Sequence, residues 1–140
     1  MWRWLAIFQR HRPQKPLSLG DQGEGIAAKF LEERGFRILE RQLRGRYGEL
    51  DLIALDAETV VFIEVKTRAS SAIGDPTEAV TVTKQKRITQ TALTYLKRRQ
   101  WLNRRVRFDV VSIIWDGKSG PPLIHHYPAA FEATGFGQMY

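Results

Sequence analysis

The chain first places apolar residues at helical spacing and then at the alternating spacing of strands. A helix is predicted to begin at Asp21, which can cap it, and to end at Gly35. The pattern then predicts three strands, a second helix from Thr81 or Thr83 to about Arg99, and one or two further strands. The expected strands cover residues 36–43, 50–55, 59–65, 106–115 and 123–127.

The strand at 59–65 is almost continuously apolar, which is typical of a central strand covered on both faces. Two amphipathic helices need a sheet against which to bury their apolar stripes. The predicted fold class is therefore α/β, with the core order α-β-β-β-α-β and helices flanking the sheet. Residues 21–128 are assigned to this domain, between an irregular or partly ordered leader (1–20) and a tail (129–140).

Composition narrows the possible classes and partners. The chain has 140 residues and no cysteine, which suits one domain in a reducing cytosol and excludes disulfides and thiolate zinc sites. Its 22 Lys and Arg against 15 Asp and Glu give a net charge of +7, which favours nucleic acid as a partner. No segment approaches the roughly 18 apolar residues of a membrane helix. We therefore expect a cytoplasmic protein without a membrane partner.

Two of the predicted strands carry charged residues where their pattern requires apolar ones. Asp51 lies between Leu50 and Leu52, and Glu64 and Lys66 lie at the end of the most apolar strand. Glu64 and Lys66 share a face because strand side chains alternate. Neighbouring buried carboxylates are tolerated when a divalent cation lies between them, and phosphodiester hydrolysis uses the same combination of ion, carboxylates and lysine. The alternative is a buried salt bridge without a catalytic purpose.

Two further carboxylates can complete such a site. Glu24 lies near the packed side of the first helix and can point toward the sheet, or it can close a capping box with Asp21. Glu49 alternates with Asp51 and so shares its face, either as an additional ligand or as a charge at the strand edge. The sequence therefore predicts a carboxylate site to which Glu24 and Glu49 are optional contributors.

The chain resembles the YraN family of predicted bacterial endonucleases, which is similar to the archaeal Holliday junction resolvases. The resemblance covers about Gly20 to Ile114 and follows the ordered segments GEGIAAKFLEERGF, RGRYGELDLIAL, VVFIEVKTR, V-x-x-x-K-Q-x-R-I and RFDVVSI. It implies a restriction-endonuclease-like PD-(D/E)xK fold with a mixed central sheet. It also implies a catalytic set and, at the rim of the site, Gln85. The catalytic set comprises Glu24, Asp51, Glu64 and Lys66.

Basic residues flank the predicted site in the sequence and can bind phosphates on either side of it. The helix N-terminus near Lys84 also attracts anions. A second basic run from Lys97 to Arg107 either contacts DNA or complements the helix C-terminus. Tyr47 and Trp101 can stack on bases or pack against the protein. The predicted nucleic-acid-binding set comprises Arg44, Arg46, Arg68, Lys84, Gln85, Lys86 and Arg87.

These features lead to the hypothesis of an endonuclease that hydrolyses DNA with Mg²⁺ or Mn²⁺. Asp51 and Glu64 would hold the metal with the backbone carbonyl of Val65, while Lys66 orients the water and Glu24 assists. The resemblance implies branched or structured DNA as the substrate, and a homodimer, because resolvase-like enzymes cut two strands. The alternative is a nucleic-acid-binding module that does not cut and acts through a protein partner, with the aromatic leader as one docking segment.

Overall fold

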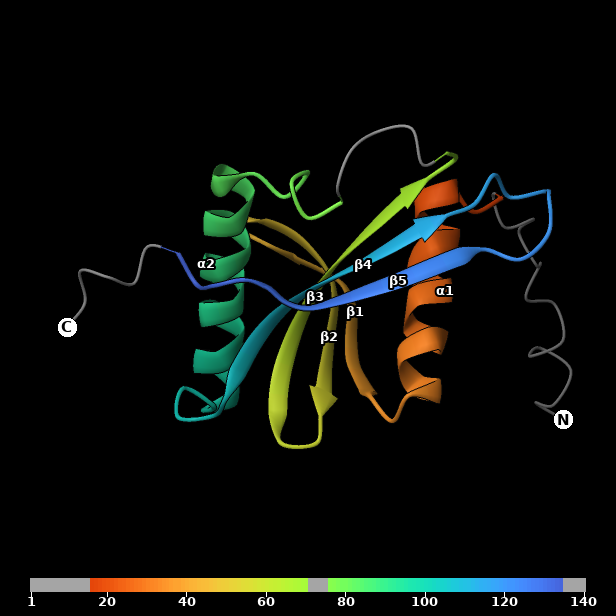
Figure 1. Ribbon diagram of the computed structural model, residues 1–140. Helices are drawn as coiled ribbons and strands as arrows, with labels where there is room; N and C mark the ends of the chain where they lie inside the picture. Colours follow the sequence, from red (N-terminus) through yellow and green to blue (C-terminus); the bar gives the residue numbers. More distant parts are fainter. Residues whose placement is uncertain (1–15, 71–75, 135–140) are drawn as a thin grey trace, which may run out of the picture.

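The computed structural model describes residues 16–70 and 76–134. One mixed sheet lies at the centre, and the two helices cover its opposite faces (Figure 1). The predicted α/β class with a helix-flanked sheet is confirmed. The elements in chain order are α1 (Leu19–Glu33), β1 (Arg37–Gly45), β2 (Gly48–Asp56), β3 (Thr59–Arg68), α2 (Val82–Arg99), β4 (Val106–Ile114) and β5 (Leu123–Phe131).

The strands lie in the order in which the chain forms them, β1-β2-β3-β4-β5. β3 and β4 are parallel, because α2 carries the chain back across one face between them, and the other neighbours are antiparallel. β3 therefore occupies the centre, and its residues 60–65 are all buried. The prediction of a central strand covered on both faces is confirmed.

Alternation along the strands divides the buried residues into two layers. β3 sends alternate side chains to each layer, as a strand period of two requires. The layer under α2 comprises Leu50, Ile53, Val60, Phe62, Val80, Ile88, Ala92, Tyr95, Leu96, Phe108 and Val110. The layer under α1 comprises Ala27, Ala28, Leu31, Leu52, Ala54, Val61, Ile63, Val65, Val111 and Ile113.

The first helix begins earlier than the sequence pattern indicated. Its N-cap is Ser18, whose side-chain oxygen accepts from the backbone N–H of Asp21 at 3.1 Å. Asp21 is therefore inside the helix, and the prediction that it caps the helix was wrong. A serine hydroxyl accepts hydrogen bonds from the free N–H groups of the first turn as well as an aspartate does. Ser18, three positions before Asp21, therefore caps the helix. Gly35 (φ +91°) follows the end of α1 as predicted, and of the two residues predicted to start the second helix, Thr81 is its cap.

Two pairs of strands extend beyond their predicted ends. β1 and β2 remain paired up to Gly45 and Gly48, which makes a longer hairpin than the apolar residues alone suggested. β5 pairs with β4 as far as Phe131, so the strand continues past residue 128, where the sequence pattern had ended the domain. The aromatic leader lies outside the described residues. Neither α1 nor α2 is long and apolar enough to span a bilayer.

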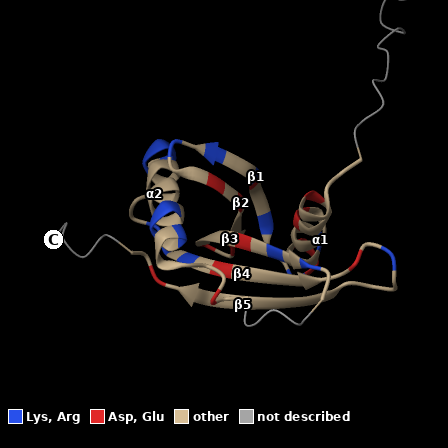
Figure 2. Ribbon diagram, turned by 90° about the horizontal axis from the view of Figure 1, so that it is seen from above, with Lys and Arg blue, Asp and Glu red and all other residues tan. Residues whose placement is uncertain are grey.

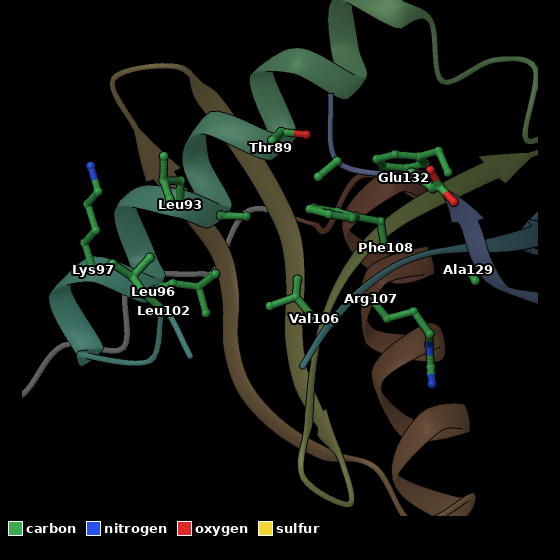
Figure 3. Close-up of a pocket in the computed structure, with 13 residues that line it drawn as sticks. Thr89, Leu93, Leu96, Lys97, Leu102, Val106, Arg107, Phe108, Ala129 and Glu132 are labelled. Carbon is green, nitrogen blue, oxygen red and sulfur yellow. The ribbon is translucent and has the colours of Figure 1, made fainter. Parts of the chain in front are cut away.

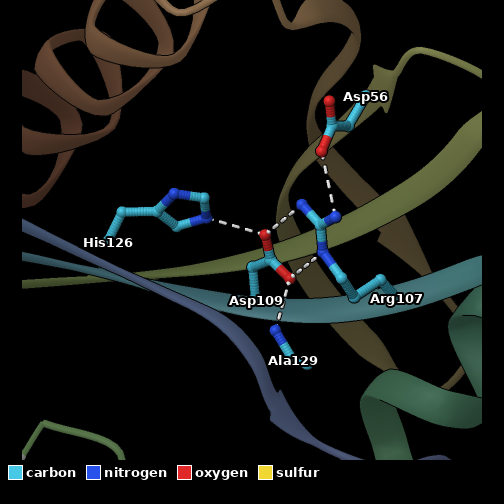
Figure 4. Close-up of polar contacts among 5 residues, drawn as sticks. All are labelled: Asp56, Arg107, Asp109, His126 and Ala129. Atoms are coloured by element: carbon cyan, nitrogen blue, oxygen red, sulfur yellow. Dashed lines mark hydrogen bonds and ion pairs between the residues drawn. The ribbon is translucent and has the colours of Figure 1, made fainter.

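A fully buried carboxylate ties β4 to its surroundings (Figure 4). Asp109 accepts two hydrogen bonds from Arg107, at 2.8 and 2.9 Å, and one from the N–H of Ala129 at 3.0 Å. His126 Nε2 lies 2.7 Å from Oδ2 of Asp109, and Arg107 also donates to Asp56 at 2.9 Å. Burial alone would raise the pKa of Asp109, but the hydrogen bonds from His126 and Arg107 lower it below its ordinary value.

Candidate functional site

The candidate site lies where β2 separates from β3. Their paired residues end at Leu52 and Ile63, whereas β3 stays paired with β4 to its last residue. Just beyond this end, the N–H of Val65 donates to Oδ2 of Asp51 at 2.7 Å. The carboxylate of Asp51 is thereby fixed at the opening between the two strands.

Two more carboxylates converge on Asp51 from different elements. Glu24 comes from α1, and Glu49 comes from β2 two residues before Asp51. Among the described residues, these three place one carboxylate oxygen each within 4.8 Å of one another. Glu24 lies inside α1, whose cap is Ser18, so the capping box with Asp21 is excluded. The shared face predicted for Glu49 and Asp51 agrees with this arrangement.

A close approach of α1 to the sheet places Glu24. Gly23 is buried in the helix, and a Cβ atom there would lie 1.8 Å from Oγ1 of Thr67 on β3. Glycine in a helix interior costs about 1 kcal/mol relative to alanine. That cost is accepted here because no larger residue lets the first turns of α1 approach the end of β3.

The cluster holds more negative charge than its surroundings stabilise. Burial, followed by the charge of Glu64, raises the pKa of Asp51 to about 8. The hydrogen bond from Val65 acts in the opposite direction but is outweighed. A carboxyl group with this pKa resists ionisation at neutral pH unless a cation lies beside it.

Glu64 sits beside this cluster and binds two lysines. Its side chain is 5% exposed, and Oε1 contacts Nζ of Lys84 and lies 3.5 Å from Nζ of Lys66. The second oxygen, Oε2, is buried and has no hydrogen-bond partner within the described part of the chain. A buried oxygen without a donor is costly, so this atom is suited to a ligand that the protein itself does not supply.

The ionisable groups of the site carry more negative than positive charge. Four carboxylates and two ammonium groups give a net charge of −2 when all are ionised, and solvent screens the charge of the exposed Arg44 beside Glu49. One divalent cation would balance this net charge. The six groups are Glu24, Glu49, Asp51, Glu64, Lys66 and Lys84.

A cleft of about 440 Å³ lies between the β1–β2 hairpin and the start of α2. Three of the six groups, Glu49, Lys66 and Lys84, line it together with Arg87. Next to it lies a second cleft of about 310 Å³, which shares Tyr47 and Thr91 with the first. Figure 2 shows the basic positions of α2 and of the end of β1 on the same side of the molecule.

The structure divides the predicted nucleic-acid-binding set. Lys84 and Arg87 line the first cleft, and Arg44 and Arg46 line the second. Arg68 lines a different cleft, beside Ser112 and His125.

Two members of the same set are placed elsewhere on α2. The side-chain amide of Gln85 donates to the carbonyl of Val80 at 3.0 Å, which fixes the start of the helix. Lys86 is exposed on the helix surface. The set therefore does not form one continuous surface, and the part nearest the carboxylates comes from two elements that face each other.

A further cleft, lined mainly by apolar residues, is separate from the carboxylates. It has a volume of about 590 Å³ and lies between α2, the start of β4 and the end of β5 (Figure 3). Leu93, Leu96 and Phe108 line it, and none of the clustered carboxylates does. It is therefore not part of the carboxylate site.

Sequence reasoning missed two contributors to the site. Gly23 was given no role in the site, although a glycine inside an amphipathic helix is itself a signal of close packing. Lys84 was assigned to phosphate binding, and its ion pair with Glu64 was not foreseen. That pair joins positions twenty residues apart and requires α2 to begin beside Glu64 of β3.

Fold and site together define a class of protein: a small α/β domain with clustered carboxylates and two lysines at the end of its central strand. The profile of the family described as "Uncharacterised protein family UPF0102" matches residues 23–113. The chain belongs to this family, which is the YraN family that its sequence resembles.

Relatives in several bacteria cover most of the chain. A UPF0102 protein of Geobacter metallireducens is 48% identical over 115 residues, which is 82% of this chain and 93% of that protein. One of Nocardia farcinica is 47% identical and covers 81% of this chain and 89% of its own. One of Rhodopirellula baltica is 41% identical over 98% of this chain and 84% of its own. The similarity to these family members therefore extends over most of the chain.

Proposed function

We propose that the protein is a Mg²⁺- or Mn²⁺-dependent endonuclease that hydrolyses DNA phosphodiester bonds, with branched or structured DNA as its substrate. The observation that carries the proposal is the convergence of Glu24, Glu49 and Asp51 within 4.8 Å. Oxygen ligands at this spacing suit hard divalent cations. Carboxylates on neighbouring strands, with a lysine two residues after the second, are what a nuclease of the restriction-endonuclease-like fold requires.

The residues fit a divalent cation in charge and in protonation. The raised pKa of Asp51, about 8, reflects surplus negative charge that a cation would remove. Asp51, Glu24 and Glu49 would hold the ion, and Glu64 offers the unpartnered Oε2. When bound, such an ion supplies charge to polarise the phosphate and lowers the pKa of a water molecule.

The two lysines of the site, Lys66 and Lys84, have different roles in the proposal. Burial, followed by the hydrogen bond with Lys84, lowers the pKa of Lys66, so its amine exchanges a proton more readily near neutral pH than a free lysine does. Burial would also lower the pKa of Lys84, but its contact with Glu64 outweighs this and raises it. In the proposal, Lys66 orients the attacking water, and Lys84 stays charged beside the phosphate.

The surface around the cleft supports a polyanionic substrate. The neighbouring cleft is lined by Arg44, Arg46 and Arg98 and by no acidic residue. Arginines at this position can bind phosphates next to the one that is cut, which fixes the strand without reading its sequence.

Cleavage of defined DNA substrates tests the proposal. Purified protein with Mn²⁺ is incubated with labelled single-stranded, duplex and four-way branched DNA, and products are separated on denaturing gels. We expect cutting that chelator abolishes and that Asp51→Asn and Glu64→Gln reduce on the order of 100-fold or more, since each removes charge from the site. Glu58→Gln, at an exposed carboxylate of the β2–β3 turn, is the control and should cut at the wild-type rate.

Two results would overturn the proposal. In the first, the wild type cuts none of the three substrates, and DNA binding survives Asp51→Asn, which identifies a non-cleaving binding module. In the second, cutting persists at the wild-type rate in Asp51→Asn, which identifies a contaminating nuclease.

A further inference from the structure

We propose that the two basic clefts form one groove for an unpaired DNA strand, with Tyr47 stacking on a base beside the cleavage position. This inference rests on the proposed function and names the feature of the substrate that the site selects: nucleotides outside a continuous duplex. In branched DNA these occur at the branch point. The groove is defined by the residues that line the two clefts between the β1–β2 hairpin and α2.

The groove is continuous because the two clefts share residues on both walls. Tyr47 belongs to the hairpin and Thr91 to α2, and each lines both clefts. One end of the groove contains Glu49 and Lys66 of the catalytic site. A strand whose phosphate lies at that end must pass Tyr47 to reach the second cleft.

Charge along the groove follows the path of a phosphodiester backbone. Its basic residues are distributed over its whole length, and its one acidic lining residue, Glu49, lies at the catalytic end. A positively charged groove with an aromatic side chain along its course is the usual arrangement for binding single strands. The basic lining residues are Arg44, Arg46, Lys66, Lys84, Arg87 and Arg98.

Tyr47 has the exposure and support that a stacking platform needs. It lies in the turn between β1 and β2 and is 37% exposed, so part of its ring is available to a ligand. The guanidinium of Arg46 lies 5.8 Å from the ring centroid, within the range of a cation–π contact that orients the ring. Trp101, the other aromatic considered from sequence, packs against Tyr95, Arg99 and Arg104 outside the groove.

The shape of the groove favours a single strand over an intact duplex. Proteins read a duplex by inserting a helix or a β-ribbon into its major groove, which is about 12 Å wide. Here the hairpin and α2 are the walls of a concavity, and their facing residues line volumes of about 310 and 440 Å³. Volumes of this size, about 300–1,000 Å³, hold small ligands such as one or two nucleotides, and a duplex does not enter them.

Binding of matched DNA forms in chelator, where no strand is cut, tests the inference. Fluorescence anisotropy measures the affinity for a labelled single strand, the blunt duplex of the same sequence, and a fork with unpaired arms. We expect the single strand and the fork to bind at least about tenfold more tightly than the duplex. Tyr47→Leu should weaken binding of both by about tenfold, the size of one lost base–aromatic stack, and should leave duplex affinity unchanged.

Two variants and a base probe separate stacking from a structural role. Tyr47→Phe keeps the ring and should bind like the wild type, and Tyr127→Leu, in the cleft beside Arg68, should not change the preference. A strand carrying 2-aminopurine should lose fluorescence on binding to wild type and to Tyr47→Phe, because a stacked base is quenched. Bound to Tyr47→Leu, it should stay bright.

The outcomes distinguish this inference from the proposed function. Equal affinity of wild type for the single strand and the duplex, or an equal loss for both in Tyr47→Leu, overturns the inference while metal-dependent cutting still supports the nuclease. Absence of salt-dependent binding to all three DNA forms overturns both.

Discussion

Asp109 on β4 and Asp51 on β2 both carry a carboxylate into the central sheet, but they meet opposite surroundings. Asp109 accepts from Arg107 and Ala129 and contacts His126, and its pKa is lowered despite burial. Asp51 has one backbone donor and other carboxylates as neighbours, and its pKa is raised to about 8. A buried charge whose partners are complete stabilises the fold, whereas one with an incomplete set points to a ligand.

The largest expected effect on stability comes from removing Asp109, whose hydrogen-bond partners are complete. Asp109→Ala removes the main partner of the partly buried Arg107 and leaves the N–H of Ala129 without its acceptor, so we expect the free energy of unfolding to fall by about 3 kcal/mol. Urea denaturation followed by circular dichroism measures this. A loss below about 1 kcal/mol would show that solvent replaces the carboxylate, and the contrast with Asp51 would then disappear.

A smaller loss of stability is expected for a substitution where α1 packs closely against the sheet. Gly23→Ala places a Cβ 1.8 Å from Oγ1 of Thr67, and the helix must shift at a cost of about 1–3 kcal/mol. Because the shift moves Glu24 away from Asp51, affinity for Mn²⁺ should fall as well. Gly25→Ala is the matched control in the same helix: outside the neighbouring helix backbone, no described atom lies within 4 Å of a Cβ placed there, so stability should stay level or rise. Equal behaviour of the two variants would contradict the close approach.

Asp51→Asn should change stability in the opposite direction from Asp109→Ala. The amide oxygen still accepts from Val65, while the unfavourable charge is gone, so metal-free protein should gain on the order of 1–3 kcal/mol at pH 8. The folded pKa, about 8, lies above the ordinary 3.8, so the unfolded chain releases the proton first as pH rises. Stability therefore falls between about pH 4 and pH 8, and the advantage of Asn should vanish near pH 4. Denaturation of both proteins in chelator at pH 4 and pH 8 measures this. No gain at pH 8, or the same gain at both pH values, would contradict the prediction.

The smallest effect is expected at the surface of the hairpin. Arg44 and Glu49 lie 3.6 Å apart, but the side chain of Arg44 is 83% exposed. Solvent screens such a pair, so Arg44→Ala should change the free energy of unfolding by less than about 0.5 kcal/mol. The same variant should weaken DNA binding and make it less sensitive to salt. A loss of stability comparable to that of Asp109→Ala would mean that exposed pairs also carry the fold.

Much of the fold follows from the apolar pattern, because period and burial depend on local sequence. The pattern predicted β3 as the central strand, the end of α1 at Gly35 and the start of α2 at Thr81 or Thr83, of which Thr81 is the cap. It did not predict Ser18 as the cap, since several polar residues in one stretch can satisfy the same N–H groups. The lengths of β1 and β5 were also missed. Pairing in β1 continues through Arg44 and Gly45, which are not apolar, and the register of β5 shifts before Phe131 pairs with Phe108.

The site was harder to predict because its decisive facts depend on partners distant in sequence. A charged residue inside an apolar strand is the same signal at Asp51, Glu64 and Asp109. What separates them is that His126 and Ala129 reach Asp109 from β5, and that α1 reaches Asp51 with a further carboxylate. Such contacts are set by topology and by the close approach at Gly23, which a pattern of apolar positions does not contain.

Calorimetric titration with Mn²⁺ tests the central claim most directly, that the carboxylates around Asp51 hold a divalent cation. At pH 7, in buffers of different ionisation enthalpy, the wild type should bind the ion and release close to one proton, because Asp51, with a pKa of about 8, is mostly protonated beforehand. Asp51→Asn should lose this binding, and Glu58→Gln should keep it. Heats that are absent in the wild type, or equal in wild type and Asp51→Asn, would contradict the account.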